Sequence, residues 1–317
     1  MTNNFKRILL ILGGIFFCLE VFCGHRIEIN PKTDMKGKPK RVEYIHFRLD
    51  NLSDTLTNEN ISNITYTEYS KNGYILESGG SFNKSRFLYN INNDLTNIIS
   101  YDSVGNLQSE SIYIYNRKRK LIERRFLCKD NLCDGKEIYE YIGNVIKVFT
   151  YDADGKLQYY AETEKRKNNK IKLLYSADGI LLSEEISELD RNGNIVKHRR
   201  YNGENYLHED RVWIYDRKGN LIEEKSLVPA FNGNITYKYD NRGNLVETVQ
   251  QRDDMVFKWT IVYNDIGLST EESYYENEIL VSRRTFKYDS KKNWIEKTDY
   301  YYNWNRIDGV KRQIDYY

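Results

Sequence analysis

The nine residues from Tyr215 to Glu223, Tyr-Asp-Arg-Lys-Gly-Asn-Leu-Ile-Glu, form a unit that recurs along this chain. Nearly the same residues run from Tyr239 to Glu247, and a third copy begins at Tyr101. The order Asp-x-x-Gly suits a type I turn followed by a residue in the left-handed conformation, which closes a three-residue hairpin loop with a bulge. The sequence therefore predicts that each copy forms the turn of a β-hairpin.

The predicted hairpin determines which residues face each other. Asp216 lies opposite Asn220, and Tyr215 lies opposite Leu221, so that Tyr and Leu form a cross-strand pair on one face. Before each turn, large side chains stand two positions apart, which is the period of a strand. The same register puts an acidic residue opposite an aromatic one in three copies: Glu223 opposite Trp213, Glu247 opposite Tyr237, and Glu296 opposite Phe286. Either that face is half-buried, or each Glu meets a tyrosine hydroxyl or a basic side chain; the sequence leaves both open.

The spacing of the copies predicts the architecture. Tyr215, Tyr239 and Tyr263 follow one another at steps of 24 residues, which is enough for two strands and two turns. The second turn of each unit varies, at 165–169, 228–234, 252–254 and 276–278. We therefore expect an all-β fold of antiparallel hairpin repeats, forming a long twisted meander, a solenoid or a partial shell. The Asp-x-x-Gly turns would lie mostly along one edge and the variable turns along the other, and open sheet edges would invite self-association.

The turn residues that best match the repeat occur in four copies. They are Asp102, Gly105, Asp152, Gly155, Asp216, Gly219, Asp240 and Gly243. The stretch from Asp152 to Gly155 also resembles the start of a calcium loop, but Thr163 stands at the twelfth position, where such a loop needs Glu. We interpret it as a repeat turn.

The N-terminus has the pattern of an export signal. Lys6 and Arg7 precede a short apolar run, and Glu20 interrupts that run before it reaches the length of a membrane span. We expect a signal peptide at 1–23, a lead-in with a first strand at 24–64 and the repeat domain at 65–317. The expected location is exported: periplasmic, outer-membrane-associated or extracellular. The rival interpretations are an uncleaved anchor and a lipoprotein signal, in which Cys18 or Cys23 is lipidated and holds the protein at a membrane.

Charge and cysteine content restrict the partners and the chemistry. The 48 basic and 46 acidic residues give a net charge of +2, which argues against nucleic acid as a partner. After the signal, Cys128 and Cys133 remain, and in an exported protein they are expected to form a disulfide across a hairpin end. The alternative is two free thiols. We expect no metal site there, because two sulfurs need two further ligands and no His is near in sequence.

The motifs at Tyr101, Tyr151, Tyr215 and Tyr239 resemble the YD repeat of the Rhs and wall-associated protein families. The resemblance covers roughly residues 65 to 300 and weakens outside these four copies. It implies an exported bacterial β-repeat protein. In large family members the repeats wind into a hollow shell around a C-terminal toxin. This chain is shorter, and it shows neither the self-cleavage motif of that family nor a toxin domain.

No catalytic, cofactor-binding or metal-binding pattern appears in the sequence. His198 and His208 lie ten residues apart and are best explained as solvated strand or loop residues. Trp213, Trp259 and Trp294, with Trp304 further on, recur near strand positions. The first three are candidates for a surface on which a sugar ring stacks, although such residues more often pack within a sheet.

These observations predict a non-catalytic, exported protein that acts as a binding or structural module at a bacterial cell surface or in the periplasm. Its partner would be a protein or a glycan, contacted through the variable turns, because variable loops on a rigid scaffold usually carry recognition. Two alternatives remain. One is a carbohydrate-binding or carbohydrate-active protein that uses exposed aromatics and carboxylates. The other is a shell or partner component of a toxin system.

Overall fold

The computed structural model describes residues 33, 35–129, 133–228 and 233–317. The expected signal peptide at 1–23, with Cys18 and Cys23, lies outside the described residues. Within them, no helix is both long and apolar enough to span a membrane.

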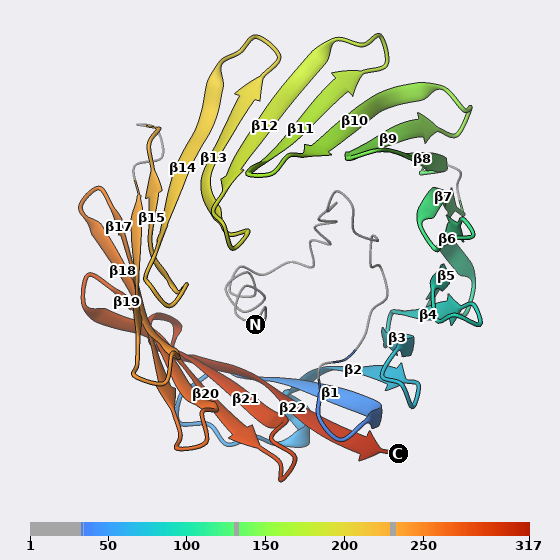
Figure 1. Cartoon of the computed structure of the whole chain (residues 1–317). Coiled ribbons are helices and arrows are strands. Elements are labelled where there is room, and N and C mark those ends of the chain that lie inside the picture. The colour runs from blue at the N-terminus through green and yellow to red at the C-terminus, as the bar shows by residue number, and fades with distance from the viewer. Residues whose placement is uncertain (1–32, 34, 130–132, 229–232) are drawn as a thin grey trace.

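The described chain forms one antiparallel sheet of 22 strands that closes on itself (Figure 1). β1 (Pro39–Leu49) pairs with β2 (Ile61–Tyr69) on one side and with β22 (Arg306–Tyr316) on the other. Short 3-10 helices lie at Asn58–Asn60 and Tyr302–Trp304. The strands between are β3 (Ile75–Gly80), β4 (Asn83–Tyr89), β5 (Leu95–Asp102), β6 (Leu107–Tyr115), β7 (Leu121–Cys128), β8 (Gly135–Ile142), β9 (Val145–Asp152), β10 (Leu157–Lys165), β11 (Asn169–Ser176), β12 (Leu181–Leu189), β13 (Ile195–Asn202), β14 (Leu207–Tyr215), β15 (Leu221–Ser226), β16 (Asn234–Tyr239), β17 (Leu245–Arg252), β18 (Met255–Tyr263), β19 (Ser269–Glu276), β20 (Ile279–Tyr288) and β21 (Trp294–Tyr301).

Closure corrects the expected open meander, solenoid or partial shell. β1 pairs with β22 in register from Val42 opposite Ile314 to Leu49 opposite Ile307. The ring therefore presents no free strand edge in its described part, which removes the expected route to self-association through sheet edges. The first strand expected within 24–64 is present as β1, and it is the strand that closes the ring. Repeat spacing predicts the hairpins, but it does not predict how far each hairpin turns the sheet.

The repeat turn forms as its residues predict. The Gly219 N–H donates to the Asp216 carbonyl at 3.0 Å, the Asp216 N–H donates to the Asn220 carbonyl at 2.8 Å, and Gly219 has a φ of 83°. The Asp216 carboxylate accepts the backbone N–H groups of Lys218 and Asn220, each at 2.8 Å, and the Asn220 amide at 2.9 Å. Tyr215 lies opposite Leu221, as expected.

One residue further along, the expected register is wrong. Ile222 is an extra residue in its strand, so that Glu223 lies opposite Ile214 and Trp213 lies opposite Glu224. The same shift places Glu247 opposite Lys238 and Glu296 opposite Lys287, not opposite Tyr237 and Phe286. A bulge moves every following side chain to the other face. Each of these two Glu residues thus meets a Lys: Lys238 Nζ lies 2.5 Å from Glu247, and Lys287 Nζ lies 2.8 Å from Glu296.

The ring has two rims. The first rim holds the turns that follow even-numbered strands, and the second rim holds those that follow odd-numbered strands. The Asp216 and Asp240 turns lie on the first rim, whereas the Asp102 and Asp152 turns lie on the second. The expected separation of motif turns from variable turns is therefore only partial, because some steps between motifs span one strand instead of two.

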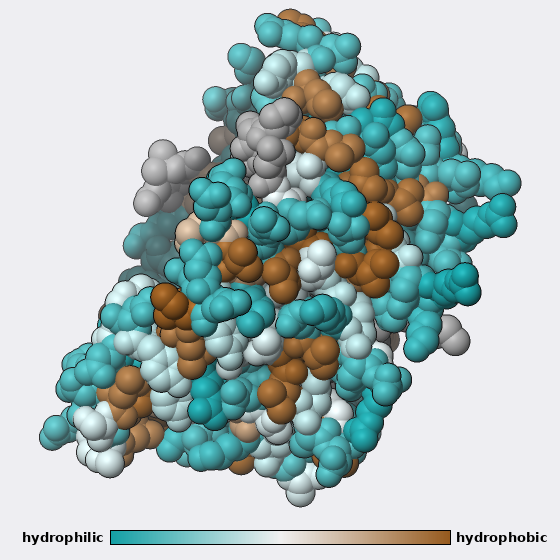
Figure 2. Space-filling model, turned by 90° about the vertical axis from the view of Figure 1, so that its left-hand side faces the viewer, coloured by the Kyte–Doolittle hydropathy of each residue, from teal (hydrophilic) through white to brown (hydrophobic). Residues whose placement is uncertain are grey.

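The two faces of the wall also differ. The tyrosines before the first-rim turns, Tyr215 and Tyr239 among them, share one face, here called the tyrosine face, with the core cluster of Leu95, Tyr113, Leu121 and Tyr139. Tyr101 and Tyr151, which precede second-rim turns, lie on the opposite face. A smaller cluster of Phe47, Leu49 and Ile307 lies on the opposite face, beside the loop between β1 and β2. Seen from outside around β17 to β19, hydrophilic side chains cover most of the wall and hydrophobic ones form short patches between them (Figure 2).

Candidate functional site

The motif tyrosines link consecutive hairpins on the first rim. The Tyr215 hydroxyl donates to the Ile195 carbonyl at 2.9 Å, and the Tyr239 hydroxyl donates to the Leu221 carbonyl at 2.8 Å. Each acceptor is the first residue of the preceding odd-numbered strand. The same bond joins Tyr89 to Ile75, Tyr115 to Leu95, Tyr141 to Leu121, Tyr263 to Leu245, and Tyr288 to Ser269. At these seven first-rim positions this bond, here called the tyrosine link, gives the Tyr hydroxyl a partner that Phe could not bind.

Burial changes the acidity of these hydroxyls. It raises the pKa of Tyr141 and of Tyr215 to about 12, because the ionised form would lose its hydration in the wall. Nearby carboxylates, Asp190 first, add to the effect at Tyr215. The tyrosine links therefore require neutral hydroxyls, which makes their role structural.

One turn on the first rim departs from the motif and gains a different link. Arg119 stands where the motif has Gly and adopts a φ of 60°. Its guanidinium binds both carboxylate oxygens of Asp94 in the neighbouring turn, at 3.0 and 2.8 Å, and it donates to the Asn92 carbonyl. Asp94 is only 1% exposed. The ion pair between two turns accounts for a departure that the sequence left unexplained.

The three candidate tryptophans share the tyrosine face but are not brought together. Trp213 lies in β14, Trp259 in β18 and Trp294 in β21. At about 4.8 Å per strand, gaps of four and three strands correspond to roughly 19 and 14 Å. Tyr274 stacks on Trp259 with centroids 5.0 Å apart, and the Arg312 guanidinium lies 3.3 Å from the Trp294 ring centre. At Trp259 and Trp294, a protein group thus lies against a ring surface that a ligand would need.

Trp304 is placed differently. It belongs to the 3-10 turn Tyr302–Trp304 on the second rim and is 66% exposed. The Tyr301 ring lies 5.4 Å from it, and the Arg306 guanidinium lies 4.9 Å from its centre. The sequence grouped Trp304 with the other tryptophans, since only the fold separates a strand position from the tip of a turn.

Ionisable side chains gather on the tyrosine face near β1 and β22, the two strands whose pairing closes the ring. Arg284 pairs with Asp299 at 2.5 Å and with Glu272 at 3.3 Å. Burial, and then the charge of Arg284, lower the pKa of Lys297 beside them. Burial and the charge of Lys297 also lower the pKa of His46. A hollow of about 390 Å³ lies here, with His46, Arg48, Asp299 and Asp308 in its lining.

This cluster is arranged for mutual pairing. Its carboxylates are held by arginines, and among the described residues no group of three or more His, Cys, Asp or Glu is placed to hold a metal ion. His198, the histidine considered in the sequence, lies 3.0 Å from the Ser187 hydroxyl through its Nδ1.

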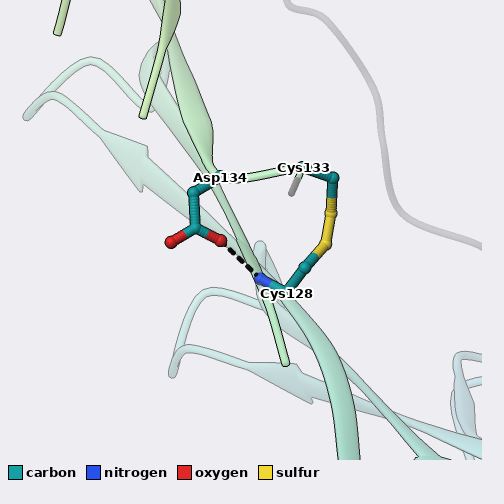
Figure 3. The surroundings of a disulfide bond; sticks show 3 residues. All are labelled: Cys128, Cys133 and Asp134. Carbon is teal, nitrogen blue, oxygen red and sulfur yellow. Dashed lines mark hydrogen bonds between the residues drawn. A yellow bond between two sulfur atoms is a disulfide. The ribbon is translucent and has the colours of Figure 1, made fainter. Parts of the chain in front are cut away.

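Cys128 and Cys133 join across the turn between β7 and β8 on the second rim (Figure 3). Their Cα atoms are 5.6 Å apart, within the usual range for a disulfide. Asp134 accepts the Cys128 backbone N–H at 2.7 Å and thereby orders the same turn. Residues 130–132 lie outside the described residues.

The second rim presents exposed apolar side chains at many of its turns. Seven of them are more than half exposed and come from seven different turns: Phe82, Val104, Ile180, Tyr206, Leu227, Ile279 and Trp304. Their identities differ from turn to turn, whereas the hairpins beneath them repeat. This rim therefore presents different exposed side chains on a repeated scaffold.

The sequence matches no protein-family model and no curated protein. Among solved structures, it is similar to TcdB2-TccC3 without its hypervariable C-terminal region, at 12% identity and a TM-score of 0.28 over 83% of this chain and 19% of that one. A porin-like protein from Bacteroides uniformis is similar at 9% identity and a TM-score of 0.32, over 90% and 99% of the two chains. Hsv2 of a Kluyveromyces yeast is similar at 10% identity and a TM-score of 0.23, over 80% and 91%.

This chain spans about a fifth of the length of the TcdB2-TccC3 chain. These similarities establish neither a family nor a function for this chain.

Proposed function

We propose that this chain is an exported, non-catalytic β-repeat protein that acts as a structural and binding module in a bacterial envelope, and that it is a short member of the YD-repeat group. The observation that carries the proposal is the contrast between a closed wall of repeated hairpins and a second rim whose exposed side chains differ from turn to turn. A rigid scaffold with variable loops is the usual arrangement for recognition.

Charged side chains of the wall pair with one another across neighbouring strands, which supports a structural role. On the tyrosine face Arg211 pairs with Glu224 at 2.8 Å. On the opposite face Lys147 pairs with Glu162 at 2.6 Å. Ion pairs on both faces suit a wall that meets water on each side, because an unpaired charge in an apolar environment is strongly disfavoured.

Contact through the second rim is tested by a partner capture from the producing cell with two matched variants. One variant replaces Phe82, Val104, Ile180 and Ile279 of the second rim by Ala. The control replaces Ile91, Ile142 and Ile266, which are exposed on the first rim, by Ala. We expect the second-rim variant alone to lose its partner while both keep the circular dichroism of the wild type. Equal loss in both variants, or loss in neither, contradicts the proposal.

Export is tested by intact-mass measurement of the protein from its native envelope. A chain that begins at Gly24 supports secretion, and a lipid-sized addition on Cys18 or Cys23 makes the protein an anchored lipoprotein. A chain that begins at Met1 and is recovered with cytosolic proteins contradicts export. A mass increase of about two hydrogens on reduction would show that Cys128 and Cys133 are bridged.

A second candidate is a shell or partner component of a toxin system, and closure of the ring favours it. With strands about 4.8 Å apart, 22 strands give a ring about 34 Å across, far wider than the barrels of about eight strands whose interiors side chains fill. Co-purification of the ring with a toxic protein in a fixed ratio is the expected result under this candidate. Recovery of the ring without any such partner from toxin-producing cells would remove it.

A further inference from the structure

We propose that Trp304 and the polar residues around it form a binding site for a pyranose ring of a surface glycan. The inference rests on the proposed function as a binding module and names the chemical class of the partner. The apolar C–H face of a pyranose packs on an indole ring, and its equatorial hydroxyls bond to planar polar side chains at the edge. Both elements meet on the second rim.

The indole is backed by protein groups and is still largely exposed. The Arg306 guanidinium lies 4.9 Å from the Trp304 ring centre and 4.8 Å from that of Tyr301. Arg306 is itself held by Asp308, with Nη2 3.0 Å from the carboxylate. Because Trp304 is 66% exposed, much of the indole surface remains accessible to a ligand. The cation also polarises the ring and fixes its orientation.

The loop beside the indole is fixed as well. Asn305 ends the 3-10 turn in the left-handed conformation, with a φ of 48°, and its amide donates to the Asn51 side chain at 3.0 Å. Asn51 in turn donates its backbone N–H to Asp54 at 3.1 Å. Leu52 and Leu56 of this loop pack against the cluster of Phe47, Leu49 and Ile307. A site built on anchored turns loses little freedom on binding.

Polar side chains flank Trp304. Asn303 and Asn305 adjoin it in the chain, Asn305 bonds to Asn51, and Asn51 bonds to Asp54. The nearby charges of Arg306 and Asp308 are paired with each other. Amides and one carboxylate match the alternating donors and acceptors of sugar hydroxyls. A protein-binding hot spot would instead be surrounded by apolar contacts, and a membrane-interface belt would present several aromatic residues at one level. The geometry therefore favours a glycan over a protein or a lipid surface.

The test is a binding titration of the whole mature protein with soluble pyranose oligomers of four to six units, covering gluco-, manno-, galacto- and N-acetylglucosamine series. The variants are Trp304→Ala, which removes the stacking ring, and Trp304→Phe, which keeps a smaller one. Ile91→Ala is the matched control, because Ile91 is also exposed, at 97%, but lies on the first rim. We expect at least one oligomer to bind, Trp304→Ala to weaken it at least about tenfold, Trp304→Phe to weaken it less, and Ile91→Ala to leave it unchanged.

A second measurement needs no variant. The binding oligomer should protect Trp304, and not the other tryptophans, from oxidation by N-bromosuccinimide, as followed by peptide mass mapping. Absence of binding across the panel, binding that survives Trp304→Ala, or equal oxidation with and without the oligomer overturns the site. Loss of vesicle binding in Trp304→Ala without any glycan binding would assign the residue to a membrane surface and also overturns it.

The same incubations separate this inference from the proposed function. Cleavage of a bound oligomer would refute the non-catalytic role while leaving the site in place. An intact ring that captures its partner through the second rim yet binds no oligomer would refute the site while leaving the module in place.

Discussion

The arc from β4 to β9 and the arc from β19 to β22 are built from the same kind of hairpin. On the tyrosine face, however, the first carries mainly apolar side chains and the second carries many charged ones. The first arc packs Leu95, Tyr113, Leu121 and Tyr139 into an apolar cluster. The second arc presents charged side chains, Glu272, Arg284, Lys297 and Asp299. Tyr115 and Tyr288 nevertheless make the same tyrosine link in the two arcs.

The comparison separates what the repeat requires from what it tolerates. The turn and the tyrosine link recur in both arcs. The turn closes each hairpin, and the link joins that hairpin to the preceding one. The filling of the face differs, so burial of apolar surface stabilises one arc and ion pairing with aromatic stacking holds the other. The predictions below test this division, beginning with the largest effect.

Alkaline pH should unfold the whole ring, because both arcs depend on neutral tyrosines. The pKa is raised to about 12 for Tyr66, Tyr141, Tyr215 and Tyr274, with burial as the largest cause. A pKa that is higher in the folded state gives stability that is complete below the unfolded value of about 10 and is lost as pH rises toward 12. We expect circular dichroism and tyrosinate absorbance to change together in that window. Tyrosines that ionise near pH 10 with the dichroism unchanged would contradict this.

Leu121→Ala should be the most damaging single change in the apolar arc. Leu121 is fully buried in the cluster, and removing a buried Leu side chain typically costs about 2–5 kcal/mol through lost transfer energy and the cavity left behind. Urea unfolding measures the effect. Leu127→Ala, at an exposed position of the same strand, is the control and should change stability by less than about 1 kcal/mol. Equal losses would show that the cluster does not stabilise the arc.

The turn-to-turn ion pair should appear as a strong coupling in a double-mutant cycle. Arg119→Gly restores the motif residue and relieves the positive φ, but it removes the cation that pairs with the buried Asp94 carboxylate, so a loss of about 2 kcal/mol is expected. Asp94→Asn restores the Asn that the motif carries at this position. The double variant should be more stable than Arg119→Gly alone, as measured by urea unfolding. Additive losses would mean that the two turns do not interact.

These cases show how far the sequence predicts the molecule. Asp216, Gly219 and Asn220 predict their turn because the interactions are local and are contained in nine residues. The bulge at Ile222 was not predicted, because a single extra residue leaves the hydrophobic pattern almost unchanged while moving every later side chain to the other face. Closure through β1 was not predicted either, since residues 39–49 carry no motif and meet β22 only through the accumulated curvature of the sheet.

The candidate site shows the same limit. Trp304 and Trp294 look alike as sequence, each near strand residues and basic side chains. Only the fold shows that Arg312 covers one of them while the tip of a turn exposes the other. Similarly, Arg119 reads as a defect of the motif until the neighbouring turn brings Asp94 within reach.

Removing the tyrosine link should weaken both arcs equally, which would establish it as the shared element. Tyr115→Phe and Tyr288→Phe each delete a hydroxyl that donates to a backbone carbonyl and leave that carbonyl without this donor. A loss of about 1 kcal/mol is expected for each. Tyr206→Phe is the control, since Tyr206 is exposed on the second rim, and it should change little. A large loss of stability in one arc and none in the other would show that the link contributes only beside a particular set of side chains on the tyrosine face.

The smallest effect is expected at Lys297, at the centre of the charged arc. Its pKa is lowered by burial and by Arg284, so the folded state disfavours its charge at neutral pH. Lys297→Met keeps the side-chain length and removes that charge, and unfolding stability should stay within about 1 kcal/mol of the wild type or rise. Lys287→Met, which breaks the pair with Glu296 on the opposite face, is the matched control and should lose at most about 1 kcal/mol. A loss at Lys297 as large as that at Leu121 would mean that the stability of both arcs depends equally on their particular side chains on the tyrosine face. The hairpin and its tyrosine link would then not be sufficient to stabilise an arc.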